Sequence, residues 1–97
     1  MATTFQSIEK EKIKSLYFPN NDVLVDPQAI LRRIAELGYA FSLGNLEHFK
    51  IKIYFEDAIS KKVVESSVLG ITDKKVMLEN NIMIPINRIY KTFKFFA

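Results

Sequence analysis

The sequence contains no cysteine and only one histidine, His48. Without cysteine, disulfide scaffolds, thiolate zinc sites, iron–sulfur clusters and cysteine nucleophiles are excluded. One histidine removes most histidine-based metal and acid–base chemistry, and we interpret His48 as a structural or surface histidine at the start of a strand. A glycine-rich phosphate loop, paired-histidine spacing and a nucleophile elbow are also missing. We therefore expect a protein that is not an enzyme, with no cofactor and no metal.

Long hydrophobic runs are missing as well. No window approaches the ~18 consecutive apolar residues of a membrane-spanning helix, and the first ten residues lack a basic stretch followed by an apolar one. With only three glycines and three prolines, linkers and low-complexity tracts are not expected. We expect no membrane partner, and zero cysteine fits a cytoplasmic location.

The length and the overall composition of the chain are those of one folded domain. The chain has 97 residues, of which 48% are hydrophobic and 26% charged, which is ordinary for a single globular domain over residues 1–97. The hydrophobic period changes near residue 46, from helical spacing to a period of two. We therefore expect a helical N-terminal segment over 1–45 and a small β-barrel over 46–97.

Two helices are predicted in the first segment. The first covers about residues 5–17, with an imperfect apolar stripe, and ends before Pro19. The second covers residues 27–37, after a capping Asp26 and before Gly38 at the left-handed C′ position. Its apolar spacing predicts three residues facing inward, namely Ile30, Ile34 and Leu37. Its charged residues are expected to face outward, namely Arg32, Arg33 and Glu36.

The second segment predicts five antiparallel strands, over residues 47–56, 62–72, 75–79, 82–86 and 90–96. Gly70 marks a bend or bulge inside the second strand. Asn80 and Asn81 tolerate positive φ and form a two-residue turn. Pro85 cannot donate to a ladder, so its side faces away from a partner or lies at an edge, and a 3₁₀ turn is expected at residues 87–89. Five short strands need closure to avoid open edges, which favours a small, strongly bent barrel.

A family resemblance rests on this segment. The stretch from Phe49 to Phe55, the run from Val68 to Asn80 and the pattern Ile84-Pro-Ile-Asn-Arg-Ile resemble the Sm-like and SH3-like small barrels. The segment 47–96 also resembles the barrels of the YolD-like family and of Rho-binding antiterminators. The expected fold class is therefore α+β, with two N-terminal helices followed by a five-stranded, strongly bent antiparallel SH3/Sm-like β-barrel.

The Sm-like resemblance implies RNA binding by two loops. One loop follows the bent strand and typically carries Asp and Asn, and the other precedes the last strand and carries Arg or Lys followed by Gly. Asp73 and Arg88 occupy similar places here. Lys75 stands near the expected Asn, and Ile89 follows Arg88 instead of Gly.

The charge distribution points to the same segment. Residues 1–45 hold equal numbers of acidic and basic side chains, so the whole net charge of +3 lies in residues 46–97. Basic groups attract phosphates and flat rings stack on bases, so RNA or single-stranded DNA is the first candidate partner. The alternative is that these lysines are solvated faces of edge strands. The candidate nucleic-acid-binding residues are Lys50, Lys52, Tyr54, Lys74, Lys75, Arg88, Tyr90 and Lys91.

The last strand carries rings on both of its faces, at Phe93, Phe95 and Phe96. Either the helices cover one face or that face is an association surface. These residues are therefore the candidate interface for a homo-oligomer or a protein partner, with the last strand adding to a neighbouring sheet edge. A protein-interaction or regulatory module, docking through the barrel edge or the helices, is the second functional hypothesis.

Overall fold

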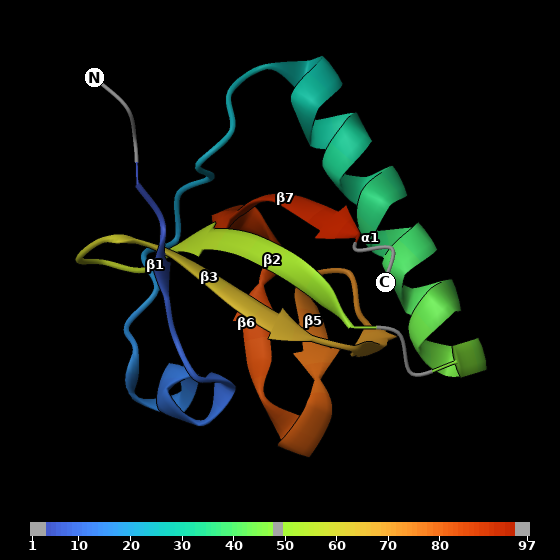
Figure 1. Cartoon of the computed structure of the whole chain (residues 1–97). Coiled ribbons are helices and arrows are strands. Elements are labelled where there is room, and N and C mark those ends of the chain that lie inside the picture. Colours follow the sequence, from blue (N-terminus) through green and yellow to red (C-terminus); the bar gives the residue numbers. More distant parts are fainter. Residues whose placement is uncertain (1–3, 48–49, 95–97) are drawn as a thin grey trace.

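The computed structural model describes residues 4–47 and 50–94. The chain begins with a short strand and a 3₁₀ helix, continues through one long α-helix, and ends in six strands (Figure 1). The elements are β1 (Gln6–Ser7), η1 (Lys10–Ser15), α1 (Pro27–Glu47), β2 (Ile51–Glu56), β3 (Lys61–Ser66), β4 (Val68–Ile71), β5 (Lys75–Leu78), η2 (Glu79–Asn81), β6 (Met83–Pro85), η3 (Ile86–Arg88) and β7 (Ile89–Lys94).

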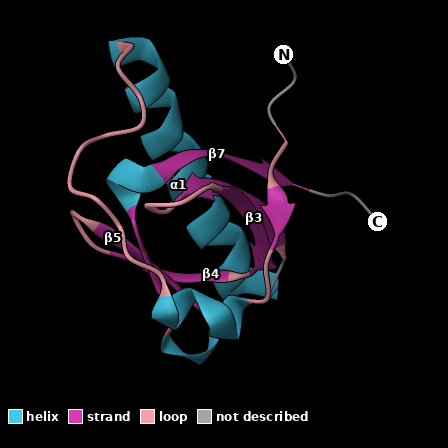
Figure 2. Ribbon diagram, turned by 90° about the vertical axis from the view of Figure 1, so that its left-hand side faces the viewer, coloured by secondary structure: helices cyan, strands magenta, loops and turns pink. Residues whose placement is uncertain are grey.

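The strands form two sheets. One has four strands in the order β1-β3-β2-β7, and the other has three in the order β4-β5-β6. All neighbours are antiparallel except β1, which lies parallel to β3 with Gln6 opposite Lys62. Figure 2 shows α1 beside the strands, and it contacts β4 and β7. The helix therefore lies where the edges of the two sheets would otherwise meet.

The core lies between the sheets and is built from alternating strand residues. Ile51, Ile53 and Phe55 of β2 are at most 2% exposed, while the residues between them are half-buried. The facing sheet contributes Val76 and Ile84, both fully buried. The period-two alternation of apolar residues therefore explains why one face of each sheet is buried.

The predicted barrel is wrong for the described residues. The expected strand 62–72 breaks after Ser66 into β3 and β4, which belong to different sheets, and no pairing joins β4 to β7. The described chain therefore has two open sheets, and seven strands instead of five. The helix α1 contacts β4 and β7, the strands on either side of the gap, and its Glu36 accepts a hydrogen bond from the β7 backbone at Thr92 N (3.0 Å).

The predicted first helix is also wrong. Residues 6–7 form β1, and only 10–15 are helical, as the 3₁₀ helix η1. The backbone N–H of Ile8 donates to Val63 O (3.0 Å), which draws this segment into the sheet. Lys10 forms an ion pair with Glu79, and the hydrogen bond from that ammonium lowers the pKa of Glu79. Long-range contacts therefore override a weak helical pattern.

The second helix begins where predicted but ends later. Asp26 Oδ1 accepts a hydrogen bond from Gln28 N (3.2 Å), and Pro27 is the first helical residue. The helix continues through Gly38 to Glu47 instead of ending at residue 37. An interior glycine costs about 1 kcal/mol. Packing of the buried Leu37 and Ala40 on the strands compensates for that cost.

The buried face of α1 differs from the predicted one. Arg33 is 4% exposed, although it was expected to face outward, and Ile34 is 57% exposed, although it was expected to face inward. Arg33 Nη1 and Nη2 donate to the two carboxylate oxygens of Asp22, each at 2.8 Å, and Nη1 also donates to Ile89 O (3.0 Å). These partners come from outside the helix, so helical periodicity could not reveal them.

The details of the hairpins follow the sequence closely. Asn80 and Asn81 have φ of 63° and 60°. The register of β4 on β5 shifts between Val68 and Gly70, where a bulge was expected. Pro85 lies in β6, an edge strand, and η3 precedes β7. The positive φ values, the bulge and the edge position are confirmed, because each depends on local backbone chemistry. The two-residue turn is wrong: the three residues of η2 connect β5 to β6, with Leu78 N donating to Ile82 O (2.7 Å). The 3₁₀ turn lies one residue earlier than predicted, at Ile86–Arg88.

Candidate functional site

The outward side of the four-stranded sheet gathers rings and lysines. Because Ile53 and Phe55 point into the core, Lys52 and Tyr54 point away from it. Across the β2–β7 ladder Lys52 lies opposite Phe93 and Tyr54 opposite Lys91, and directly opposed residues share a face. We call this surface the outer face, and it comprises Phe5, Lys52, Tyr54, Lys61, Tyr90, Lys91 and Phe93.

Three of its rings form one cluster. The ring of Phe5 meets Tyr54 edge-on, with centroids 5.1 Å apart, and meets Tyr90 edge-on at 5.7 Å. Lys91 Nζ lies 5.3 Å from the Tyr54 ring centroid, and Lys61 Nζ lies 5.1 Å from that of Tyr90. Flat π-surfaces and ammonium groups are therefore within one side-chain length of each other, as cation–π contacts require.

Tyr90 is fixed at the edge of this cluster. The β2–β7 register shifts between Tyr54 and Phe55, so Tyr90 lies at a bulge. Its hydroxyl donates a hydrogen bond to Glu56 Oε1. Burial, reinforced by this hydrogen bond and by the negative charge of Glu56, raises the pKa of Tyr90 to about 12. The phenol is therefore a neutral hydrogen-bond donor at neutral pH.

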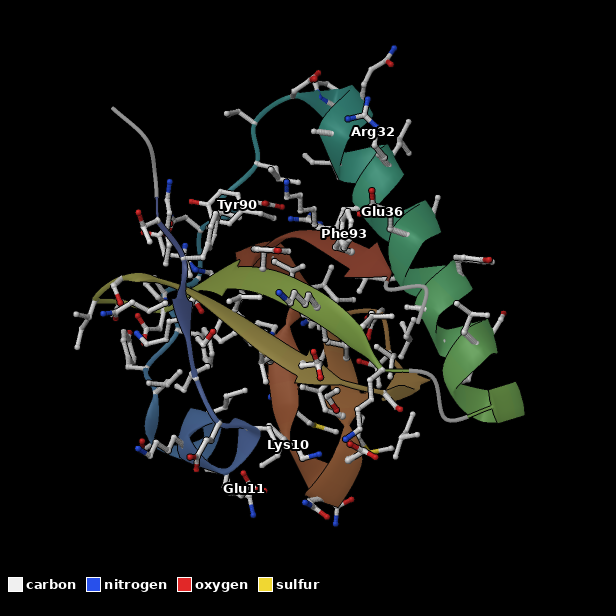
Figure 3. All side chains as sticks on the ribbon, in the orientation of Figure 1. Lys10, Glu11, Arg32, Glu36, Tyr90 and Phe93 are labelled. Atoms are coloured by element: carbon white, nitrogen blue, oxygen red, sulfur yellow. The ribbon has the colours of Figure 1, made fainter. Side chains whose placement is uncertain are left out.

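A small pocket of about 150 Å³ adjoins the outer face between α1 and β7. It is lined by Ala29, Arg32, Arg33, Glu36, Tyr90 and Lys91. Figure 3 shows Arg32 and Glu36 on α1, beside the strand that carries Tyr90 and Phe93. Arg32 and Lys91 thus bring two positive charges to a recess that borders the rings.

Arg88 does not belong to this surface. It is 5% exposed, and its Nε donates to Glu56 O (3.0 Å) while Nη1 donates to Asn21 O (2.8 Å). The guanidinium therefore ties η3 to the end of β2 and to the loop before α1. Nε and Nη1 of Arg88 are thus bound within the fold, away from the outer face, and its contact with a ligand stays a prediction.

The other predicted basic residues lie elsewhere. Lys74 and Lys75 are exposed at the turn between β4 and β5, in the other sheet. Lys50 precedes β2 and lies near enough to Glu79 for its charge to help lower the pKa of that carboxyl. Of the eight predicted nucleic-acid-binding residues, the structure thus brings together Lys52, Tyr54, Tyr90 and Lys91.

The predicted oligomer interface is described only in part. Phe93 is 54% exposed on the outer face, whereas Phe95 and Phe96 lie outside the described residues, as does His48. The free edge of β7 is not open to a neighbouring strand at Thr92, because Glu36 of α1 accepts the hydrogen bond of that backbone N–H.

Sequence reasoning missed Phe5, Arg32 and Lys61. Phe5 was assigned to a helix, and Arg32 is brought to β7 only by the position of α1. The signal for Lys61 was present, because the hairpin pairs it with Glu56 and so puts both residues on one face.

Comparisons with protein-family models, with curated proteins and with solved structures gave no match. The resemblance to small barrels in residues 47–96 therefore stays a prediction. Within 4–47 and 50–94, no helix is long and apolar enough to cross a membrane. The same residues contain no group of three or more His, Cys, Asp or Glu side chains that could hold a metal ion.

Proposed function

We propose that this chain is a non-enzymatic module that binds single-stranded RNA or DNA on the outer face. The observation that carries the proposal is the shared surface of Tyr54, Phe93, Lys52 and Lys91. Sequence-tolerant binding of single strands combines aromatic stacking with cationic contacts to the backbone. A cytoplasmic location, expected from the absence of cysteine, would give such a module access to RNA.

The rings supply the stacking contacts. Phe93 is 54% exposed on the outer face. Tyr54 presents a face on which the Lys91 ammonium rests at 5.3 Å. A lysine stem is flexible, so an incoming base can replace the ammonium on the ring while the ammonium moves to the adjacent phosphate.

The cations supply the backbone contacts. Lys52, Lys61 and Lys91 lie on the outer face, and Arg32 borders the small pocket between α1 and β7. Arginine binds phosphate oxygens with two parallel hydrogen bonds, so this recess suits one phosphate group of a strand whose bases lie on the rings. Glu56 and Glu65 lie on the same sheet face, which limits the excess of positive charge and predicts moderate affinity.

Fluorescence anisotropy with a labelled single-stranded oligonucleotide tests the proposal. With about three phosphate contacts, the logarithm of affinity should fall with the logarithm of salt concentration at a slope of about −2. Phe93→Ala should weaken binding at least fivefold, since stacking contributes about 1–3 kcal/mol per base. Tyr17→Ala is the matched control, because it removes a 73% exposed ring beyond the end of η1.

The charge contribution is tested by a pair of double variants. Lys52→Gln/Lys91→Gln should weaken binding and flatten the salt dependence, whereas Lys74→Gln/Lys75→Gln, which removes equal charge from the other sheet, should change both much less. Equal losses of affinity in the two double variants would show that the oligonucleotide is attracted non-specifically to a basic protein. Absence of binding at low salt would refute the proposal and leave a protein-interaction module as the remaining hypothesis.

A further inference from the structure

A second and larger cavity lies away from the outer face. This cleft has a volume of about 1010 Å³ and is bounded by α1, the loop around residues 18–22, the turn between β4 and β5, and η3. Among residues 4–47 and 50–94, Arg33 alone lines both the cleft and the small pocket near β7. The cleft is therefore a separate site, and it is large enough for a small organic ligand.

The wall of the cleft is largely apolar. Phe18, Leu37, Ile71 and Ile86 line it, and each packs within or against the hydrophobic core. Ile34 also lines it and is 57% exposed, so an isoleucine side chain in a concave site is left facing water. Covering such a side chain with an apolar group releases about 25 cal/mol for each Å² removed from water. The cleft therefore favours a ligand with an apolar body.

The rim of the cleft is positively charged. Lys74 and Lys75 line it, and neither forms an ion pair with another residue in the described part of the chain. Of the two carboxylates there, Asp22 is held by Arg33, which leaves Asp73 as the nearby negative charge. Two ammonium groups against one carboxylate favour an anionic group on the ligand.

Arg33, which lines both the cleft and the small pocket, has a buried hydrogen-bond donor without a partner among the described residues. Arg33 uses Nη1 and Nη2 for Asp22 and Ile89, but its Nε is buried and has no partner among the described residues. Buried polar groups are nearly always paired, so a donor left over in a cavity-lining side chain needs an acceptor. Because Arg33 also lines the small pocket near β7, this donor does not distinguish the two cavities, and Lys74 and Lys75 are what favour an anion in the cleft.

We propose that this cleft binds a small organic anion with an apolar body, such as an acyl-chain or aromatic carboxylic acid. The apolar body covers Ile34 and the wall around Leu37, and the carboxylate is bound by Lys74 and Lys75. A ligand of this kind satisfies the apolar wall and the unpaired cations together, which a neutral apolar molecule would not do.

The probe is 8-anilinonaphthalene-1-sulfonate, whose fluorescence rises in apolar sites, compared with the neutral N-phenyl-1-naphthylamine. The wild-type chain should bind the sulfonate saturably at one site. Lys74→Gln/Lys75→Gln should raise its Kd about fivefold, because two exposed charge contacts are lost, and should leave binding of the neutral dye unchanged. Lys52→Gln/Lys91→Gln, the matched control from the outer face, should change neither.

A second variant locates the apolar body. Ile34→Glu places a negative charge in the wall at a position exposed enough to tolerate it, and it should weaken binding of the sulfonate at least tenfold. Far-UV circular dichroism and urea unfolding verify that each variant is folded, since partly folded proteins also bind this dye. Binding that is unchanged in folded Ile34→Glu would overturn the proposal.

Competition between the dye and carboxylic acids identifies the chemical class of the anion. Displacement of the dye by dodecanoate, by 1-naphthoate or by both supports the proposal and tells an acyl-chain acid from an aromatic one. If neither acid displaces the dye, or if the outer-face variant loses as much affinity as the cleft variant, the proposal fails. Displacement by an acidic peptide alone would assign the cleft to a protein partner instead.

Discussion

Removal of one negative charge from the loop before α1 should destabilise the protein measurably. In Asp22→Asn, Arg33 keeps its charge and its burial but loses the carboxylate that accepts from both of its terminal nitrogens at 2.8 Å. The new amide oxygen can still accept one hydrogen bond, and Ile89 O remains. The loss is therefore about one charge-assisted hydrogen bond together with the charge attraction.

The magnitude follows from the exposure of the two partners. A hydrogen bond to a charged group contributes about 1.5–3 kcal/mol. The Arg33 side chain is 4% exposed but that of Asp22 is 32% exposed, so solvent screens part of the attraction. We expect the free energy of unfolding to fall by about 2 kcal/mol, which lowers the urea midpoint of a domain this size by about 1 M.

The dependence on pH provides a second measurement. The hydrogen bond from Arg33 holds the pKa of Asp22 below its usual value. The stabilisation is therefore present above the unfolded-state pKa and is lost as the pH falls through the lower native pKa. The difference in stability between wild type and Asp22→Asn should shrink over that acidic range.

Asp26→Asn is the control for this substitution. It also removes one carboxylate beside α1, but asparagine caps a helix as well as aspartate does, so its stability should change by only a few tenths of a kcal/mol. Urea midpoints that coincide for the two variants at pH 7 would refute the idea that Asp22 compensates the buried charge of Arg33.

Three further predictions concern the core, one turn and one tyrosine. Phe55→Ala removes a fully buried ring and should cost about 3–5 kcal/mol in a urea titration; a loss below about 1 kcal/mol would contradict its place in the core. Asn80→Ala should cost about 1 kcal/mol because φ is 63°, whereas Asn80→Gly should be neutral or stabilising; equal effects would contradict that backbone conformation. When absorbance at 295 nm is followed as the pH is raised, the wild type should show a tyrosine ionisation near pH 12 that is missing in Tyr90→Phe. Because the native pKa of Tyr90 is raised above its ordinary value of 10.0, its contribution to stability is complete below that pH and declines as the pH rises towards about 12. Stability that is equally insensitive to pH in wild type and Tyr90→Phe over this range would contradict the contact with Glu56.

The predictions that succeeded depend on neighbours in the sequence. Alternation placed Ile53 in the core and Tyr54 on the outer face, and the asparagine pair identified a turn without further information. These features follow from the pleat of a strand and from the φ preferences of single residues. Much of the candidate site on β2 and β7 could be predicted for the same reason.

The predictions that failed depend on residues far apart in the sequence. The burial of Arg88 was not predicted, because its hydrogen-bond partners Glu56 and Asn21 lie 32 and 67 positions away; its role as a ligand contact stays a prediction. Arg33 was placed in solvent because a charged side chain normally belongs there, but Asp22 lies eleven positions earlier and pairs with it. Closure of the strands into a barrel was inferred from the need to cover edges, a need that α1 partly meets by lying along β7.

The position of α1 has a consequence for the order in which the protein can fold during synthesis. The helix packs on β7, which begins 42 residues after the helix ends. At about 5–20 residues per second, the ribosome needs roughly 2–8 seconds to add them. Until then the carbonyl of Ile89 and the backbone N–H of Thr92, which bind Arg33 and Glu36, do not exist. A nascent chain that has just completed α1 therefore carries a marginally stable helix, because the strands β4 and β7 on which it packs have not yet been made.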